Sequence, residues 1–430
     1  MIRSMFTAIN GLFAQQNYMD VIADNLANVN TQGFKSSSVT FKDQFAQLVQ
    51  SGAAPTTGLG GKNPIQIGLG TNIGSISQNF TQGALQSTGR DLDLAIQGDG
   101  FFVYRKETTQ YYSRDGSIGI DAQGYLVNVS TGDQIMGWQA DGTGAIDTGA
   151  PLEGIAIPID ATVARATTNS FMLGNLDAKT VNGGTYNVTV GAYDSLGVIR
   201  SVTLQFTKIH AAGEEILPAT TPATFFPSSE WQWNATGDVD PTGTLSGVVN
   251  FNQEGQFINP NLPLNYSPTS VSVAGSPGAT TSFPVGIDLS GLTMLSATNT
   301  ATMGSQNGLA AGSLTGFNVS ASTGEIFGVY SNGEQRALGQ LAAALFVNPA
   351  GLIRQGDNRY TVGLNSGEAR ISAAGSGGRG TIASGYTEGS NVDMSREFAN
   401  MIMAQRGFQA NSRVITTSDE MLQELVNIKR

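Results

Sequence analysis

Few residues of this chain have types and spacings that could support catalysis or metal binding. The one histidine, His210, ends a run that is typical of a strand, and the chain has no cysteine. A metal site needs several suitable ligands, and a Ser/His/Asp triad needs a nucleophile on a strand-to-helix turn, which no motif near His210 supplies. The sequence therefore predicts no metal site and no catalytic residue.

Two further patterns fit chemical motifs only formally. Asp91 and Asp93 would share one face of a strand. Acid–base catalysis needs a cleft that the sequence does not indicate, so we expect the two carboxylates to serve in a turn and on the surface. Gly375, Gly377 and Gly380 satisfy a GxGxxG pattern, but a phosphate-binding loop needs a helix directly after it, whereas 381–385 continues as extended chain. We therefore predict that the chain is not an enzyme and binds no cofactor.

The composition indicates a folded chain that is mainly β. Its 430 residues suggest about two to four domains, and 55 glycines with only 13% charged residues are typical of short strands joined by turns. The net charge is −11, and no Lys or Arg lies between Lys208 and Arg336. Such a surface repels phosphate, so we expect neither nucleic acid nor an anionic membrane as a partner.

The first residues do not have the pattern of a signal peptide or a membrane span. Arg3 precedes several apolar residues, but Asn10, Gln15 and Gln16 interrupt the apolar run that either segment would need. We therefore expect no membrane insertion, and export, if it occurs, without a cleaved signal peptide.

The two ends of the chain carry the strongest periodic pattern. Apolar residues at helical spacing from 2 to 29 predict an amphipathic helix that stops near Gly33, and a capping signal at 390–393 opens a second helix of about 35 residues. In each helix, large apolar residues recur at seven-residue steps, as in the seam of a coiled coil. These candidate polymerisation residues are Met5, Leu12, Met19 and Leu26 in the first helix, and Met394, Met401, Phe408, Ile415 and Leu422 in the second.

Apolar stripes of this kind need a partner. Burial of each large side chain contributes about 1.5 to 3 kcal/mol, so helices that left them all in water would forgo much stabilisation. The simplest interpretation is that the two helices pair within one monomer, which covers one stripe. Flanking residues such as Val414 and Met421 would then stay exposed unless other copies of the chain covered them. The pattern therefore favours self-assembly, with the chain as its own partner.

Short motifs at both ends resemble the rod and hook proteins of the bacterial flagellum. The N-terminal motif spans Asn25 to Lys35 (NLANVNTQGFK), and the C-terminal motif combines 390–395 (SNVDMS) with 401–409 (MIMAQRGFQ). Segments 97–103 and 113–116 are similar to the β-rich part of the same family. The motif residues that we single out are Asn25, Asn28, Gly33, Phe34, Asn391 and Asp393.

A long insert at about 161–320 favours a hook protein over the shorter distal rod proteins. Within it, Tyr193 to Gly197 (YDSLG) resembles an outer-domain hairpin of hook proteins, and 314–317, 330–334 and 345–349 resemble the segment through which the chain returns. A distal rod subunit is the nearest alternative. A surface adhesin and a β-sandwich hydrolase are alternatives from other classes, but neither explains the paired helices.

The expected fold class is α+β, mainly β, with nested discontinuous β-rich domains and long N- and C-terminal amphipathic helices forming a coiled coil. Segment 41–49 is expected to be a short amphipathic piece, and 51–74 is either a packed connector or a floppy linker. Trp231 and Trp233 are expected in a core, and 214–227 and 267–281 in loops. The expected parts are inner helices 1–30 and 391–430, an extended connector 31–75 and 381–390, an inner β domain 76–160 and 321–380, and an outer β domain 161–320.

The resemblance also implies a function and partners. It implies a subunit that self-assembles into the hook, a flexible tube that joins rod and filament and transmits torque. Further partners would be rod proteins, hook–filament junction proteins, the hook cap and the flagellar export apparatus. The implied location is the hook and basal body, outside the cell.

Overall fold

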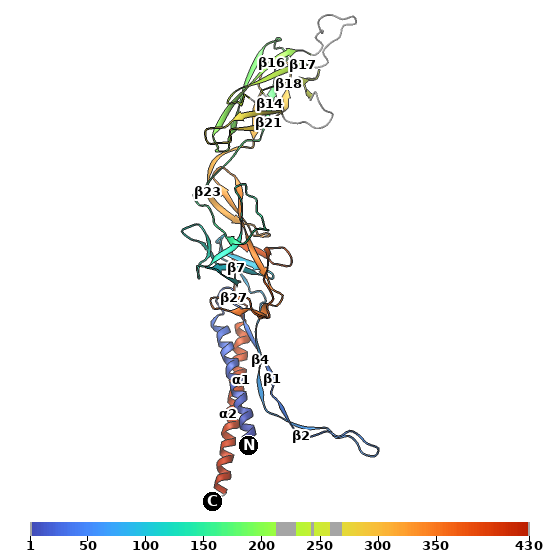
Figure 1. Cartoon of the computed structure of the whole chain (residues 1–430), viewed down its shortest axis with the longest axis vertical. Coiled ribbons are helices and arrows are strands. Elements are labelled where there is room, and N and C mark those ends of the chain that lie inside the picture. The colour runs from blue at the N-terminus through green and yellow to red at the C-terminus, as the bar shows by residue number, and fades with distance from the viewer. Residues whose placement is uncertain (1, 212–228, 242–244, 259–268, 429–430) are drawn as a thin grey trace. The chain divides into compact units, whose positions relative to one another are not determined.

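The computed structural model describes residues 2–211, 229–241, 245–258 and 269–428. Most of its regular structure is β, with one long helix at each end of the chain (Figure 1). The chain folds into two compact units, each built from segments that are discontinuous in sequence. Unit 1 contains Met1–Pro158, Asn318–Phe327 and Ala337–Arg430, and unit 2 contains Ile159–Phe317 and Gly328–Arg336. The prediction of a mainly β fold with two long terminal helices is confirmed.

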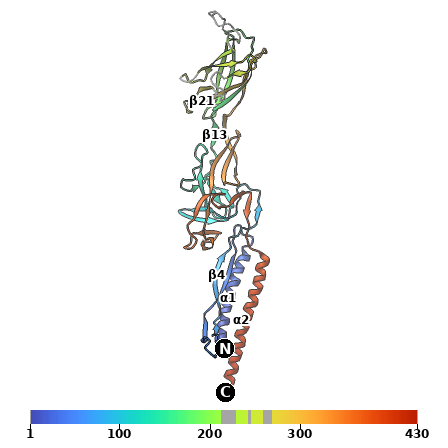
Figure 2. The ribbon, with the colours of Figure 1, turned by 90° about the vertical axis from the view of Figure 1, so that its right-hand side faces the viewer.

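The terminal helices belong to unit 1 and lie side by side in both views (Figures 1 and 2). Helix α1 spans Ile2–Ala27 and α2 spans Met394–Ile428, which matches the predicted length of the second helix. Asp393 begins α2 as its N-cap, because its carboxylate accepts hydrogen bonds from the N–H groups of Ser395 and Arg396 at 2.9 and 3.2 Å. Ser390 lies before the cap, so the predicted capping box reduces to a single capping aspartate.

Two ribbons of two strands follow α1, in the segment that was expected to be a connector. Strands β1 (Ser37–Asp43) and β4 (Thr71–Gln78) pair antiparallel, as do β2 (Ala46–Gln50) and β3 (Ile65–Gly68). The first ribbon lies along α1, and Tyr18 meets Phe41 edge to face at 5.5 Å. Every residue of β2 and β3 is exposed, so the second ribbon has no packed face within its own chain.

The β part of unit 1 centres on a sheet in which neighbouring strands follow the order β25-β11-β7-β8-β27-β26. Its core includes Phe101, Tyr112, Trp138, Phe346 and Tyr360. Two small pairs, β5 with β30 and β6 with β29, bring the chain back to the start of α2. The bounds are β5 Leu85–Ser87, β6 Leu94–Gln97, β7 Phe101–Lys106, β8 Thr109–Ser113, β9 Ile118–Ile120, β10 Leu126–Asn128, β11 Gln134–Gln139, β12 Glu153–Gly154, β25 Gln335–Leu345, η1 Pro349–Gly351, β26 Ile353–Arg354, β27 Arg359–Thr361, β28 Arg370–Ala373, β29 Thr381–Ser384 and β30 Tyr386–Glu388.

Unit 2 is built on two sheets around one apolar core. One sheet has the order β20-β21-β14-β22 and the other β15-β16-β17-β18-β19. Trp231 and Trp233, two residues apart on β17, are both buried in this core, as the sequence predicted. The bounds of the strands in these two sheets are β14 Asn169–Asn175, β15 Thr185–Tyr193, β16 Ile199–His210, β17 Ser229–Gly237, β18 Ser246–Phe251, β19 Phe257–Ile258, β20 Thr269–Ala274, β21 Ser282–Thr293 and β22 Thr302–Gln306. Three further strands, β13 Thr162–Arg165, β23 Leu309–Val319 and β24 Glu325–Tyr330, continue the sheet that contains β25 and β11.

In unit 2 the predicted hairpin is confirmed, and one predicted loop is partly wrong. Asp194 closes the predicted hairpin between β15 and β16 by accepting hydrogen bonds from the N–H groups of Leu196 and Val198 at 3.0 and 2.9 Å. The predicted loop 267–281 is partly wrong, because β20 pairs with β21 and turns Val271 and Val273 into the core. Alternating Ser and Val in that segment outweighs its loop-like composition. The predicted loop 214–227 lies outside the described residues.

Candidate assembly site: the terminal helices and their junction

The two helices approach each other through small side chains. Ala8 and Ala404 are buried, and Gly11 and Gly407 each face a polar side chain of the opposite helix. A Cβ atom on Gly11 would lie 2.6 Å from Asn411 Nδ2, and one on Gly407 would lie 3.0 Å from the Gln15 amide carbon. A larger residue at either glycine would have to displace the Asn411 or Gln15 side chain that faces it, so small residues suit the close approach of the helices.

The residues predicted as the seam lie beside this small-residue contact. Met394 is exposed, and the other eight are half-buried: Met5, Leu12, Met19, Leu26, Met401, Phe408, Ile415 and Leu422. The structure brings the seam residues of α1 and those of α2 together in one helix pair, but part of each side chain stays in solvent. Pairing within one chain therefore does not bury the apolar stripes completely.

A second set of large apolar side chains on the helices is mostly exposed. On α1, Phe6 and Phe13 are 60% and 61% exposed and lie seven residues apart, on one face. On α2, Met403, Val414 and Met421 are also exposed, and their spacings of 11 and 7 residues again put them on one face. We call these five residues the outer stripes. The sequence predicts Val414 and Met421 as flanking residues but does not single out the seven-residue pair Phe6 and Phe13.

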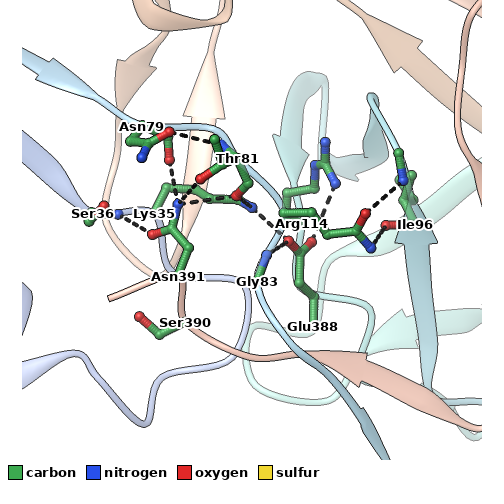
Figure 3. A network of polar contacts seen from close by, with 12 residues as sticks. Lys35, Ser36, Asn79, Thr81, Gly83, Ile96, Arg114, Glu388, Ser390 and Asn391 are labelled. Atoms are coloured by element: carbon green, nitrogen blue, oxygen red, sulfur yellow. Dashed lines mark hydrogen bonds and ion pairs between the residues drawn. The ribbon is translucent and has the colours of Figure 1, made fainter. Parts of the chain in front are cut away.

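The junction between the helices and the β part of unit 1 contains a buried cluster of charges. Lys35 Nζ lies 2.6 Å from Glu388 Oε1, and an Arg114 guanidinium nitrogen lies 3.4 Å from Glu388 Oε2. Lys35 Nζ also donates to the Thr81 carbonyl at 2.8 Å, and the Gly83 N–H donates to Glu388 at 2.8 Å. Figure 3 shows Glu388 between the two cations. The cluster joins a residue that follows α1 to one that precedes α2.

The charges of this cluster do not balance, since two cations share one carboxylate. Burial lowers the pKa of Lys35, although Glu388 opposes that shift, and burial likewise lowers the pKa of Arg114. The guanidinium of Arg114 also lies over the ring of Phe101, with 5.4 Å between its central carbon and the ring centroid. Glu388 is therefore the group on which both buried cations depend.

Two of the motif asparagines hold the junction through their side-chain amides. Asn391 accepts from the Ser36 N–H at 2.7 Å and donates to the Asn79 carbonyl at 2.7 Å, which ties three segments together (Figure 3). Asn25 is buried at the end of α1 and exchanges two hydrogen bonds with the backbone of Ser37, both at 2.8 Å. These bonds fix where the chain leaves one helix and enters the other.

The other motif residues end the helices or pack under them. Asn28 donates to the Asp24 carbonyl at 2.9 Å and so caps the last turn of α1. Gly33 has φ +69°, a region that glycine favours, and a Cβ there would lie 2.7 Å from the Asp115 nitrogen. Phe34 is buried beneath the guanidinium of Arg354, 4.9 Å from its ring centroid. Together with the Asp393 cap, all six motif residues thus gather at or beside the junction.

The residues considered for chemistry have ordinary contacts. His210 Nε2 lies 3.3 Å from Glu230 Oε2, and Asp93 lies 3.7 Å from Arg90. Gly375 and Gly377 have φ values of +71° and +58° in the turn between β28 and β29. In the part of the chain that the structure describes, no three His, Cys, Asp or Glu residues are grouped as metal ligands. Neither described helix is long and apolar enough to cross a membrane.

Known families match successive parts of this chain. The family described as "Flagella basal body rod protein" matches 5–35, and "Flagellar basal body rod FlgEFG protein C-terminal" matches 383–428. Between them, "Flagellar hook protein FlgE/F/G D1 domain" matches 95–170, and "Flagellar basal body protein FlaE D2 domain" matches 158–309. Paired terminal helices, a polar junction and these matches define the class as the rod and hook proteins of the flagellum.

Individual relatives narrow this class. The flagellar hook protein FlgE of Borreliella burgdorferi is 35% identical over the whole of both chains, and that of Treponema pallidum is 34% identical, also over the whole of both. FlgE of Salmonella typhimurium is 33% identical over 99% of this chain and 100% of the relative. The chain belongs to the flagellar hook protein family.

Proposed function

We propose that this chain is the structural subunit of a bacterial flagellar hook and polymerises through its terminal helices. The observation that carries the proposal is the outer stripes, since these five residues are among the large apolar side chains that stay exposed after α1 and α2 have paired. Covering each by a neighbouring copy would contribute up to about 1.5 to 3 kcal/mol. Contacts of one face with a different face of the next copy build a helical polymer when the rotation between copies does not close a ring.

The predicted seam is part of the same proposal. Its half-buried residues, from Met5 to Leu422, border the small-residue contact and would complete their burial in a coiled coil of helices from several copies. The inner helices, the connector, the inner β domain and the outer β domain would then form successive layers of the tube. Bending would come from polar contacts that exchange partners in the outer layers.

The ribbon of β2 and β3 offers a second surface for neighbouring copies. Phe45 is 86% exposed, and Leu48, Val49, Ile65 and Ile67 are exposed beside it. An isolated two-stranded ribbon is only marginally stable in water, so this segment needs a surface to pack against. Another copy of the chain supplies such a surface in a polymer, which favours the connector that packs over the floppy linker.

The proposal includes a location and partners that follow from the family. The subunit would leave the cell through the export apparatus of the flagellum without a cleaved signal peptide, and would contact rod proteins, junction proteins and the hook cap. It would have no catalytic role. A distal rod subunit is the second candidate, because the flagellar basal-body rod protein FlgG of Bacillus subtilis is 30% identical over the whole of both chains.

Substitution of Val414 by glutamine tests the helix contact. Val414 is exposed on the outer stripe of α2, and Thr416, two residues on, is exposed on a different face of the same helix. We expect Val414→Gln to raise the critical concentration for polymer about tenfold or more, through loss of apolar burial and desolvation of the amide. The matched variant Thr416→Gln should polymerise as the unaltered chain does.

Sedimentation of concentrated protein and electron microscopy of the pellet read out this test. Short curved tubes support a hook subunit, straight rigid tubes support the rod alternative, and unaltered chain that remains monomeric contradicts both. Equal critical concentrations for the two variants would show that the outer stripe is not a contact surface.

A further inference from the structure

Methionine is concentrated on the terminal helices. Two methionines lie on α1 and four on α2, which makes six of the 11 in the chain. On α2, Met394, Met403 and Met421 are 45%, 60% and 50% exposed. Their thioether groups are therefore open to reagents in solution while the subunit is unassembled.

Met5, Met19 and Met401 on the helices are half-buried, and the described methionines outside the helices are buried or half-buried. Met136 in the core of unit 1 and Met172 in the core of unit 2 are 1% and 0% exposed. Met294 and Met303 are partly buried against the core of unit 2, and the Trp231 indole N–H donates to the Met294 sulfur at 3.5 Å. The most exposed sulfur atoms of the described chain thus lie on the helix that we propose as a polymer contact.

We infer that Met394, Met403 and Met421 are oxidation sites, and that oxidation to sulfoxide at the two outer-stripe residues, Met403 and Met421, stops the free subunit from polymerising. This inference rests on the proposed function of the outer stripes. The oxidant would be a peroxide. One peroxide oxygen forms a bond to sulfur, which loses two electrons, while the O–O bond breaks and the second oxygen leaves as water with the peroxide protons.

A sulfoxide changes the physical character of the stripe. The thioether is apolar and adaptable, whereas the S–O group is a strong dipole that accepts hydrogen bonds. Met403 and Met421 flank Val414 on one face of α2, so both groups would lose water when a neighbour covers that face. Each sulfoxide buried without a donor should raise the critical concentration roughly tenfold.

Burial of the outer stripe in the polymer should protect its methionines from oxidation. A neighbouring copy that covers the outer stripe also covers the sulfur atoms of Met403 and Met421, and access controls how fast a methionine is oxidised. Oxidation therefore acts on subunits before assembly, and assembly ends their sensitivity. Because methionine sulfoxide reductases reverse the modification, the block is a switch rather than permanent damage.

The experiment uses the full-length chain and hydrogen peroxide. Monomer is treated for increasing times, each methionine is followed by peptide mass spectrometry, and polymerisation is then measured by sedimentation. We expect Met394, Met403 and Met421 to be oxidised well before Met136 and Met172, and the critical concentration to rise roughly tenfold for one sulfoxide on the stripe and roughly a hundredfold for two. Treatment with the two sulfoxide reductases should restore assembly.

The matched variant carries Met394→Leu, Met403→Leu and Met421→Leu, which keep the stripe apolar and remove the sulfur. Its critical concentration, measured before and after peroxide, should change far less than that of the wild-type chain, and Met403→Leu alone should weaken the peroxide effect. Oxidised wild-type chain that assembles at the untreated critical concentration would overturn the inference, as would equal inhibition of the triple variant. Failure of untreated wild type to assemble would instead contradict the proposed function.

Discussion

In the sandwich of unit 2 the largest apolar side chains, Trp231 and Trp233, are completely buried, whereas on the terminal helices Phe6 and Phe13 are mostly exposed. The sandwich closes its core within one chain and needs no partner. The helices pair through a contact of small residues, bury Ile22, and leave other large residues half-buried or exposed, which we propose that other copies cover. On that proposal, folding of unit 2 and assembly through the helices depend on different residues of the same polypeptide.

Alanine substitution at one residue of each kind tests this comparison most strongly. Trp231→Ala removes a fully buried ring and should lower the free energy of unfolding by about 3 to 5 kcal/mol. Phe13→Ala removes an exposed ring and should change that free energy by less than about 0.5 kcal/mol, yet raise the critical concentration for polymer. Calorimetry of dilute monomer and sedimentation of concentrated protein measure the two effects. The comparison fails if both variants change the same property.

The junction that connects the helices to the β part of unit 1 should be nearly as sensitive. Glu388→Gln removes the carboxylate that buried Lys35 and Arg114 share and should cost about 3 to 5 kcal/mol in the unfolding of unit 1. Lys35→Met leaves one cation with one carboxylate, so its cost should be smaller. Chemical denaturation followed by the fluorescence of Trp138, which lies in unit 1, gives both values. A larger loss for Lys35→Met would contradict the charge imbalance described above.

Alkaline pH should weaken the β part of unit 1. Burial raises the pKa of Tyr360 from 10.0 to about 12. Between those values the unfolded state loses the phenol proton first, so stability present below pH 10 is lost as pH rises toward 12. The loss should approach about 2 to 3 kcal/mol, the value of a two-unit shift.

Tyr360→Phe is the control for this pH dependence. The phenyl ring keeps the edge-to-face contacts with Phe80 and Phe101 but cannot ionise. Unfolding midpoints measured from about pH 9 to 12 should therefore fall less steeply for the variant. Parallel curves would mean that this phenol does not contribute to alkaline unfolding.

The smallest expected effect concerns the first turn of α2. Asp393→Ala removes the side-chain cap on the N–H groups of Ser395 and Arg396 and should cost about 1 kcal/mol of helix stability. The critical concentration should then rise about fivefold, because the same helix must be ordered in the polymer. Asp393→Ser keeps a capping oxygen and should behave nearly as wild type in the same sedimentation assay. Identical behaviour of the alanine and serine variants would exclude a capping role.

Much of this architecture could be predicted from local sequence. Seven-residue repeats located both helices, and the YDSLG segment located the hairpin that Asp194 closes. The pairing of Lys35 with Glu388 could not be predicted from the sequence, because 353 residues separate them and neither residue type indicates its partner. The small-residue contact also escaped prediction, since a repeat of large residues does not say which face another helix approaches. Ala8, Gly11 and Ala404 acquire their meaning only from the neighbouring helix.

The long segment of unit 2, Ile159–Phe317, begins and ends on neighbouring strands. Thr162 on β13 lies opposite Ser313 on β23, so the chain enters and leaves this region at one place. A segment attached in this way can be lengthened, shortened or replaced, because the spacing between its two attachment points stays constant. Lineages could therefore enlarge, shrink or exchange this portion, and alter what the surroundings encounter, without disturbing the machinery that joins one copy to the next.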